Sequence, residues 1–461
     1  MWADLIRQVP GPRYRAIVQV ISDAIRSGKL SARDQLPTHR ELARQLDIDV
    51  GTASRAYSEL RRRGLISGEV GRGTFVAETV RDAPPSISEA PSTGSFIDLS
   101  HNFPLNAPTS PLVARTIEEL SRDCDIASLM THQVDLGHAH HREAGRAWLD
   151  FNGLSDAGGE VAVTAGAQHG LLLAISALTT PGGRVMTEAF TYFGMKSVAT
   201  MLGLELVAID IDGEGLVPDS FENACRTSGA KVLYCTPTLH NPTTALMSEA
   251  RREDIAKISR RYGIHIVEDD VYGFLLEPRV RPLCSQAPDL TFYVTSLSKC
   301  IGPGLRIGFL RFPASYREKV GLAIRATTLM ASPLTAEIAA RMIETGFLHC
   351  IAADQRAMMK QRQSTAELLL QGHHMQRHPQ SFHVWLEMAN GWTPQEFSLE
   401  AERLGVGVAP GDLFTVSPAT RSRAVRLCIS AANDASQLNS ALSLLSGLLE
   451  KPRKASASLV A

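Results

Sequence analysis

The sequence predicts a mixed α/β protein with two folded parts, a small helical domain at the N-terminus and a larger three-layer α/β domain behind it. Three observations lead to this prediction. In the larger part, short apolar runs such as 231–235, 264–267 and 292–294 alternate with helical segments, as in a sheet that helices cover on both faces. Residues 1–77 instead contain three helical segments. A stretch rich in Pro and Ser, residues 78–96, separates the two parts and reads as a linker.

The whole-chain net charge of −1 conceals an uneven distribution of charge. Residues 1–77 hold 13 Lys and Arg against 8 Asp and Glu, a net charge of +5, while the rest of the chain is acidic. A basic domain attached to an acidic one is expected to bind a polyanion.

The first two helices of the basic domain are marked by spacing and by capping residues. Apolar residues recur at helical spacing over 14–25, and Gly28 ends the run. A Thr-x-x-Glu capping box at 38–41 then predicts that a second helix begins at Thr38 and runs to about Leu46.

A third helix is predicted over 50–63, with Asp49 as its N-cap and Gly64 at its end. One face of it carries Val50, Ala53, Ala56, Tyr57 and Leu60, and the opposite face carries polar side chains that include Thr52 and Arg55. Residues 65–76 follow as a β-hairpin with Arg72 between two glycines. This order predicts a helix-turn-helix with a wing, whose outward helix face suits a DNA major groove. The alternative is a small basic three-helix domain that binds protein.

The N-terminal part resembles the GntR-type winged helix in three segments, 36–43, 52–57 and 71–76. The resemblance implies binding to double-stranded DNA, mostly through phosphate contacts that fix the register. The residues that it places at the DNA are Thr38, Arg40, Thr52, Arg55 and Arg72.

In the larger part, Lys299 follows Asp269 by about thirty residues. An aldehyde cofactor needs a lysine amine to form an imine, and its pyridine nitrogen needs a carboxylate to stay protonated. The pair therefore predicts a site for pyridoxal 5'-phosphate, with Lys299 as the catalytic amine and Asp269 at the ring nitrogen. Tyr272 could donate to the phenolic oxygen of the cofactor. By itself, the Ser-x-Ser-Lys segment would read as a solvated loop.

A phosphate group needs hydroxyls, backbone N–H groups and a fixed positive charge. Ser296, Ser298 and Arg306 can supply the hydroxyls and the charge from the segment around Lys299. Residues 164–168 lie between an apolar strand-like run and an apolar helix, so their N–H groups can also receive a phosphate at a helix N-terminus.

These motifs resemble the fold-type I, aminotransferase class I family of pyridoxal-phosphate proteins over most of residues 97–448. In that family the segment with Gly166, Ala167 and Gln168 is a phosphate cup. The resemblance further implies that Tyr192 stacks on the cofactor ring, that Asn241 binds its phenolic oxygen, and that Arg426 grips a substrate carboxylate.

His132 departs from the family pattern, in which a tyrosine at this position crosses from the partner subunit to the cofactor phosphate. A histidine can still donate a hydrogen bond, but it has a shorter reach and titrates near neutral pH. The alternative is a tolerated polar substitution. Although His138, His140 and His141 stand nearby, the sequence offers no accompanying Cys or carboxylate at ligand spacing, so no metal site is predicted.

A winged helix joined to an aminotransferase-like domain resembles the MocR subfamily of GntR-type regulators. The implied domains are a DNA-binding domain over 1–77, the linker 78–96, a pyridoxal-phosphate domain over 97–450 and a disordered tail over 451–461. The implied function is that of a ligand-responsive transcriptional regulator that binds a DNA operator as a homodimer. It would sense an amino acid or amine through external aldimine formation.

Two other functions remain open, an active pyridoxal-phosphate-dependent aminotransferase that also binds DNA, and a cofactor-free binding module. The seven cysteines are scattered without a Cys-x-x-Cys pair, as in reduced cytosolic proteins. With no run of 18 apolar residues and no leader-like start, the chain is expected to be cytoplasmic and not to enter a membrane.

Overall fold

The computed structural model describes residues 6, 13–26, 30, 34–62, 65–69, 73–76, 96–104, 109–155, 158–417 and 420–451. Arg72, the linker as far as residue 95 and the tail from residue 452 lie outside the described residues.

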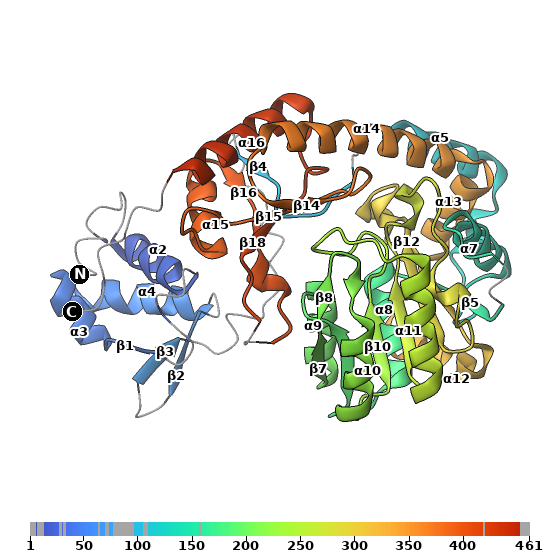
Figure 1. Ribbon diagram of the computed structural model, residues 1–461, viewed down its shortest axis with the longest axis horizontal. Coiled ribbons are helices and arrows are strands. Elements are labelled where there is room, and N and C mark those ends of the chain that lie inside the picture. The colour runs from blue at the N-terminus through green and yellow to red at the C-terminus, as the bar shows by residue number, and fades with distance from the viewer. Residues whose placement is uncertain are drawn as a thin grey trace.

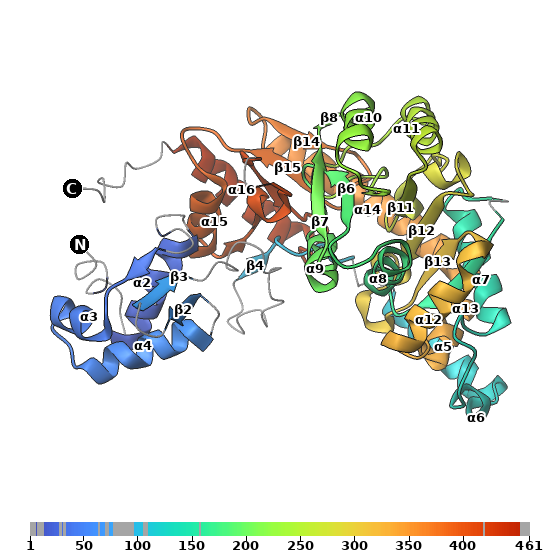
Figure 2. The same ribbon diagram turned by 90° about the horizontal axis from the view of Figure 1, so that it is seen from below.

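The N-terminal domain contains the three predicted helices and the predicted hairpin (Figures 1 and 2). They are α2 (Arg13–Arg26), α3 (His39–Leu46), α4 (Val50–Arg62), β2 (Ile66–Glu69) and β3 (Gly73–Val76). A strand that the sequence did not predict, β1 (Gln35–Leu36), pairs antiparallel with β3 and completes a three-stranded sheet. Two residues are too few to show strand periodicity, and the pairing with β3 is what makes this segment a strand.

Side-chain caps begin the second and third helices as predicted. The Thr38 hydroxyl accepts from the Glu41 N–H over 3.2 Å, and the Asp49 carboxylate accepts from the Thr52 N–H over 2.9 Å. The predicted inner face of α4 is buried except at its first residue. Val50 is 45% exposed, since it lies in the first turn, where the helix has not yet reached the domain core.

The larger domain is built on a seven-stranded sheet that is parallel except for β13. In spatial order its strands are β5 (Glu160–Thr164), β13 (Gly308–Phe312), β12 (Thr291–Ser296), β11 (His265–Asp269), β10 (Val232–Cys235), β6 (Arg184–Glu188) and β7 (Glu205–Ile209). The predicted strands over 231–235, 264–267 and 292–294 are β10, β11 and β12 at the centre of this sheet.

Helices cover both faces of the sheet and make the three layers (Figures 1 and 2). One face packs on α8 (Ala167–Leu178), α9 (Phe193–Leu202) and α12 (Arg317–Thr327), and the other on α7 (Ala139–Phe151), α10 (Pro218–Thr227) and α11 (Glu249–Tyr262). In β10, Val232 and Tyr234 pack into the core under α8, α9 and α12. Leu233 and Cys235 pack into the core under α10 and α11 on the opposite face. A strand with both faces buried needs this continuous apolar run.

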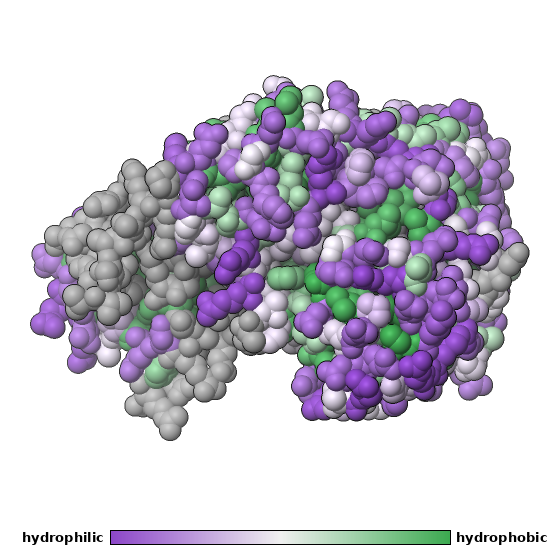
Figure 3. Space-filling model, in the orientation of Figure 1, coloured by the Kyte–Doolittle hydropathy of each residue, from purple (hydrophilic) through white to green (hydrophobic). Residues whose placement is uncertain are grey.

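A second, antiparallel sheet lies beside the first, in the order β14 (Met375–Arg377), β15 (Val384–Glu387), β18 (Ala424–Leu427) and β17 (Ala409–Pro410). The other helices of the larger domain are α5 (Ser110–Asp123), α6 (Ile126–Leu129), α13 (Pro333–Glu344), α14 (Phe347–Leu369), α15 (Pro394–Arg403) and α16 (Ala435–Glu450). In the space-filling view, apolar residues show between the lobe with α14 and the lobe with the seven-stranded sheet (Figure 3).

The chain enters the larger domain through β4 (Ile97–Asp98), which pairs in parallel with β16 (Val406–Gly407). We call residues 97–104 the entry strap. The strap is also fixed along its length, since Leu99 donates to the Gly407 carbonyl and accepts from the Cys428 N–H, each over 2.8 Å. It is the first described segment after the predicted linker.

All seven cysteines are free thiols. None of the helices in the described ranges combines the length and the apolar character that crossing a membrane requires.

Candidate functional site

The predicted cofactor residues converge where the parallel strands of the large sheet end. Asp269 is the last residue of β11, Lys299 lies on a single 3₁₀ turn (Leu297–Lys299) after β12, and Gly166 follows β5. Asn241 follows β10, and Tyr192 follows β6. The carboxyl ends of parallel strands are where α/β sheets bind ligands, because the loops there leave a crevice.

Of the two carboxylate oxygens of Asp269, one accepts a hydrogen bond and the other has no hydrogen-bond partner among the described residues. Its Oδ2 accepts from the Tyr234 hydroxyl over 2.8 Å, while its buried Oδ1 has no hydrogen-bond partner among the described residues. Burial raises the pKa of Asp269 to about 6, and the hydrogen bond from Tyr234 and the charge of Lys299 counteract part of the rise. A buried, unpaired carboxylate oxygen is what a protonated ring nitrogen requires.

The Lys299 amine donates to the backbone carbonyl of Asn102 in the entry strap. Burial lowers the pKa of Lys299 to about 8, a value that includes lowering by Arg426 and Arg306 and opposing effects from Cys428 and Asp269. A lysine with a pKa in this range is partly neutral near pH 8, as a nucleophilic amine must be.

The predicted phosphate residues come together around the N-terminus of α8. Gly166 has a φ of +87°, and a Cβ there would lie 2.7 Å from the Arg306 Nη2. The Arg306 Nη2 also donates to the Ala165 carbonyl over 3.2 Å. The Ser296 hydroxyl lies 2.9 Å from the Ser298 hydroxyl and 3.1 Å from the Ile307 carbonyl. A guanidinium, a hydroxyl and a helix N-terminus form a site for a phosphate.

Gln168 and Tyr192 lie together at one side of this site. The Gln168 amide donates to the Gly194 carbonyl over 2.9 Å, and a Cβ on Gly194 would collide with the Tyr192 ring at 2.2 Å. Burial raises the pKa of Tyr192 to about 12, and Asp269, Arg426 and Arg306 all act on it electrostatically. Tyr192 is therefore a neutral aromatic ring close to the charged groups of the site.

Arg426 is only 2% exposed and is aligned by three contacts. It donates to the Asn241 Oδ1 over 2.8 Å and to the Ser100 carbonyl over 2.7 Å, and its guanidinium lies 4.8 Å from the centre of the Phe414 ring. Since arginine only donates hydrogen bonds, the Asn241 oxygen must face it. The Asn241 NH₂ group is left for a phenolic oxygen, as the family resemblance implies.

Tyr272 is held by residues that sequence reasoning missed. Its hydroxyl accepts from the Asn102 amide over 2.8 Å, and the same amide lies 3.3 Å from the His383 Nδ1. Asn102 thus contacts Lys299 through its backbone and Tyr272 through its side chain. No local motif marked Asn102, because it stands in a short polar run that reads as a loop.

His132 is not brought to the site within the subunit. It is exposed, beyond α6, and no hydrogen bond or ion pair in the described part of the chain joins it to the other predicted residues. The nearby His141 bonds to Glu337 of α13 over 3.0 Å, and His140 lies 3.6 Å from the same carboxylate. The fold therefore supplies a carboxylate that sequence spacing did not reveal, although no three metal-binding groups converge anywhere in the described ranges.

The predicted DNA-contacting residues lie on the helices of the N-terminal domain. Arg40 and Arg55 are exposed, and the Arg55 guanidinium lies 4.2 Å from the centre of the Tyr14 ring. Thr38 and Thr52 take part in the helix caps described above. Arg72 is outside the described residues.

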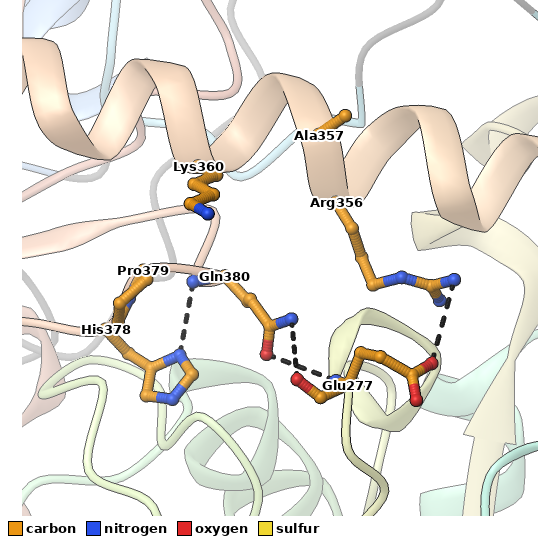
Figure 4. Close-up of a pocket in the computed structure, with 7 residues that line it drawn as sticks. All are labelled: Glu277, Arg356, Ala357, Lys360, His378, Pro379 and Gln380. Carbon is orange, nitrogen blue, oxygen red and sulfur yellow. Dashed lines mark hydrogen bonds and ion pairs between the residues drawn. The ribbon is translucent and has the colours of Figure 1, made fainter.

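A separate groove of about 500 Å³ lies beside α14. Figure 4 shows Lys360 and Arg356 pointing from the helix into it, with Arg356 3.9 Å from Glu277. Its lining consists of Glu277, Arg356, Ala357, Lys360, His378, Pro379 and Gln380. None of the predicted site residues is among them.

The side chains at the strand ends fit pyridoxal phosphate on structural grounds. The unpaired Asp269 oxygen suits its ring nitrogen, the free Asn241 amide suits its phenolic oxygen, and the Gly166–Arg306 cradle suits its phosphate. Bound there, the cofactor supplies an aldehyde carbon for reaction with primary amines and a ring that withdraws electrons.

Comparisons with known proteins agree with both parts of the chain. Residues 95–445 match the model of the family Aminotransferase class I and II, and residues 13–76 match that of the family Bacterial regulatory proteins, gntR family. In the solved kynurenine aminotransferase of Pyrococcus horikoshii, the fold recurs with a TM-score of 0.72 and 23% identity, over 79% of this chain and 93% of that one.

Two relatives match along nearly their whole length. The uncharacterized HTH-type transcriptional regulator YdeF of Bacillus subtilis is 28% identical over 97% of both chains. The vitamin B6 salvage pathway transcriptional repressor PtsJ of Salmonella typhimurium is 25% identical over 94% of this chain and 97% of its own. The chain therefore belongs to the aminotransferase class I and II family, and it carries the gntR-family N-terminal domain that marks the MocR-type regulators.

Proposed function

We propose that this protein is a pyridoxal-phosphate-dependent transcriptional regulator that binds DNA through its N-terminal domain and responds to an amino acid or amine. The structure of the site and the names of the full-length relatives both support a regulator. One observation carries the ligand response. The entry strap, which follows the linker from the DNA-binding domain, runs through the cofactor site.

The strap is bound by the two side chains that a ligand would engage. The Ser100 carbonyl accepts from Arg426 over 2.7 Å, and the Asn102 carbonyl accepts from Lys299. Arg426 is the residue expected to hold a ligand carboxylate, and Lys299 the residue expected to react. A ligand carboxylate that engages Arg426 competes with the Ser100 carbonyl for the hydrogen-bond donors of Arg426.

Competition for these donors gives the ligand a different affinity for the two arrangements of the strap, which a regulatory response requires. Ligand occupancy loosens the strap at Ser100, whereas its outer end stays paired through β4 and β16. The strap is therefore the element that we expect to transmit ligand binding to the linker and the DNA-binding domain.

The proposed assembly is a cytoplasmic homodimer on a DNA operator with two half-sites. Support for a dimer comes from exposed apolar side chains around α6 and His132, since Met130 is 73% exposed and Val134 is 64% exposed. Large apolar side chains gathered on one surface indicate a protein interface. His132 lies among them and would then meet the partner subunit, where the family places its tyrosine.

DNA binding with and without ligand tests the proposed function. The full chain loaded with pyridoxal phosphate is titrated onto its own upstream DNA, and a panel of amino acids and amines is added. We expect at least one compound to change both the absorption spectrum of the bound cofactor and the dissociation constant for DNA. The variant Lys299→Ala should bind DNA but lose the response.

A compound that changes the spectrum but leaves DNA affinity unchanged would contradict the regulatory proposal. Repeated conversion of such a compound to its oxo acid would instead support the alternative, an aminotransferase that also binds DNA. The complete site, with Lys299, Asp269 and Arg426 all in place, is the observation that keeps this alternative open.

A further inference from the structure

A chain of hydrogen bonds links four side chains and one backbone carbonyl behind the cofactor site. The His383 Nε2 lies 3.1 Å from the His240 carbonyl, and its Nδ1 lies 3.3 Å from the Asn102 amide nitrogen. The Asn102 amide donates in turn to the Tyr272 hydroxyl over 2.8 Å. The Ser381 hydroxyl also approaches the His383 Nδ1, at 3.4 Å.

The direction of every hydrogen bond in this chain follows from its first member. A carbonyl only accepts, so the proton of a neutral His383 must be on Nε2, facing His240. The His383 Nδ1 is then an acceptor, and the group of Asn102 that faces it must be the NH₂. Both hydrogens of that amide are thus used, one toward His383 and one toward Tyr272.

The Tyr272 hydroxyl is therefore an acceptor toward Asn102, and its own hydrogen remains available. In the described part of the chain it donates to no protein acceptor. Burial raises the pKa of Tyr272, so the hydroxyl keeps this hydrogen at physiological pH. If the Asn102 amide were turned over, its oxygen would face Tyr272 and take the hydrogen.

We propose that Asn102 and His383 are positioning residues, which orient the Tyr272 hydroxyl so that it donates its hydrogen to the bound cofactor. The inference rests on the proposed site but not on the regulatory function. His383 acts without contacting the ligand, by preventing the Asn102 amide from turning over. Asn102 is itself a residue of the entry strap, and its backbone carbonyl also accepts a hydrogen bond from Lys299.

His383 is suited to this role because it remains neutral. Burial lowers its pKa to about 3, with the charges of Arg426 and Lys299 contributing to this decrease. Replacing His383 by a neutral residue therefore removes no charge from the site. The other groups that act electrostatically on Tyr272 are Arg426, Cys428, Asp269 and Tyr192, and the variants below leave them unchanged.

The test is the pH midpoint at which the absorption of the bound cofactor changes, measured on the full chain without ligand. A hydrogen bond donated to the phenolic oxygen favours its ionised form and keeps this midpoint low. Tyr272→Phe should raise the midpoint by about one to two pH units, the effect of one hydrogen bond to a charged group. His383→Phe should raise it in the same direction, because the amide can then turn over.

His383→Gln is the conservative control. A glutamine can donate to the His240 carbonyl and accept from Asn102 at the same time, so its midpoint should stay within about 0.3 units of the parent protein, a small part of the change for one full hydrogen bond. A purely structural role for His383 would not distinguish Gln from Phe in this way.

Asn102→Asp provides an independent variant, since a carboxylate cannot donate and takes the Tyr272 hydrogen. Its charge also raises the midpoint directly, so it is measured again in the Tyr272→Phe background. A smaller increase in that background supports the proposal, and an equal increase shows a charge effect alone and overturns it. The proposal is also overturned if His383→Phe leaves the midpoint unchanged. A parent protein that takes up no pyridoxal phosphate would instead refute the site itself.

Discussion

Tyr234 donates a hydrogen bond over 2.8 Å to one carboxylate oxygen of Asp269 and leaves the other oxygen of Asp269 buried and unpaired among the described residues. An unpaired acceptor in a buried position is costly unless a ligand satisfies it. The pair therefore holds a carboxylate in position for a cationic partner. The ring nitrogen of pyridoxal phosphate is the partner that this family provides.

Asp269→Asn should weaken cofactor binding more than Tyr234→Phe does. The first change removes the negative charge that faces the ring nitrogen, a charge-assisted hydrogen bond of about 1.5–3 kcal/mol, or about 10- to 150-fold in the dissociation constant. Tyr234→Phe only removes the hydrogen bond that Tyr234 donates to the Asp269 carboxylate and leaves the charge in place. Titration with pyridoxal phosphate followed by absorbance measures both, and equal affinities in all three proteins would contradict the role of Asp269.

Gly166→Ala should reduce cofactor affinity because its Cβ would occupy the place of the Arg306 guanidinium, 2.7 Å away. Gly182 offers a control, since its φ of +78° is also positive while no atom lies within 4 Å of its Cβ. We expect both variants to lose at least about 1 kcal/mol of stability, because alanine is strained at a positive φ. Only Gly166→Ala should lose affinity for pyridoxal phosphate, and a similar loss in Gly182→Ala would show that strain alone is responsible.

Local sequence patterns predicted the fold and the pairing of Lys299 with Asp269, while the family resemblance supplied most of the other cofactor residues. Asp269 ends a recognisable strand and Lys299 follows another, and a capping box marked α3. Arg426 was named through the family resemblance. Asn102 and His383 had no such signal. Asn102 lies 170 residues before its partner Tyr272, and 281 residues before His383. Tertiary packing alone decides which polar residues meet at such separations.

Met130→Arg should convert the proposed dimer into a monomer, because it places a charge in the apolar surface around α6. Leu368→Arg on α14 is the matched control, since Leu368 is 70% exposed and Met130 is 73% exposed. The molar mass measured by light scattering after size-exclusion chromatography should halve for Met130→Arg and stay unchanged for Leu368→Arg. A dimer that persists in Met130→Arg would place the interface elsewhere.

Arg40→Ala and Arg55→Ala should each weaken DNA binding and reduce its salt dependence. Each phosphate contact contributes about 0.9 to the slope of log K against log salt concentration, so each variant should lower the slope by about that amount. Lys257→Ala removes the same charge from α11 in the other domain and should leave the slope unchanged. Fluorescence anisotropy over a range of salt concentrations measures all three, and unchanged slopes for both arginine variants would refute the predicted DNA surface.

Buried histidines should destabilise the folded state as the pH drops below neutral, because the fold holds them neutral while the unfolded chain binds protons. The folded-state pKa of His383 is about 3, below its ordinary value of 6.5. Between these values the unfolded chain binds more protons, so the contribution of His383 to stability is present above pH 6.5 and is lost as the pH falls toward 3. His169 and His240, each with a pKa of about 4, act in the same direction.

Glu188 and Glu268 oppose this trend in part of the range. Burial raises the pKa of each to about 7, so their contribution is present below their ordinary value of 4.5 and is lost as the pH rises through 7. Comparison with a variant that changes only His383 separates the two effects, because the carboxylates are common to both proteins. His383→Gln does not titrate at this position.

The free energy of unfolding of His383→Gln, relative to that of the parent protein, should therefore increase as the pH is lowered. From pH 6.5 to pH 5 the expected relative gain is about 2 kcal/mol, since each unit between the two pKa values corresponds to about 1.36 kcal/mol. Urea unfolding followed by circular dichroism at pH 7.5, 6.5 and 5 measures this difference. If the two proteins keep a constant difference across these pH values, His383 is not held neutral by the fold, and the assigned direction of its hydrogen bonds to His240 and Asn102 fails with it.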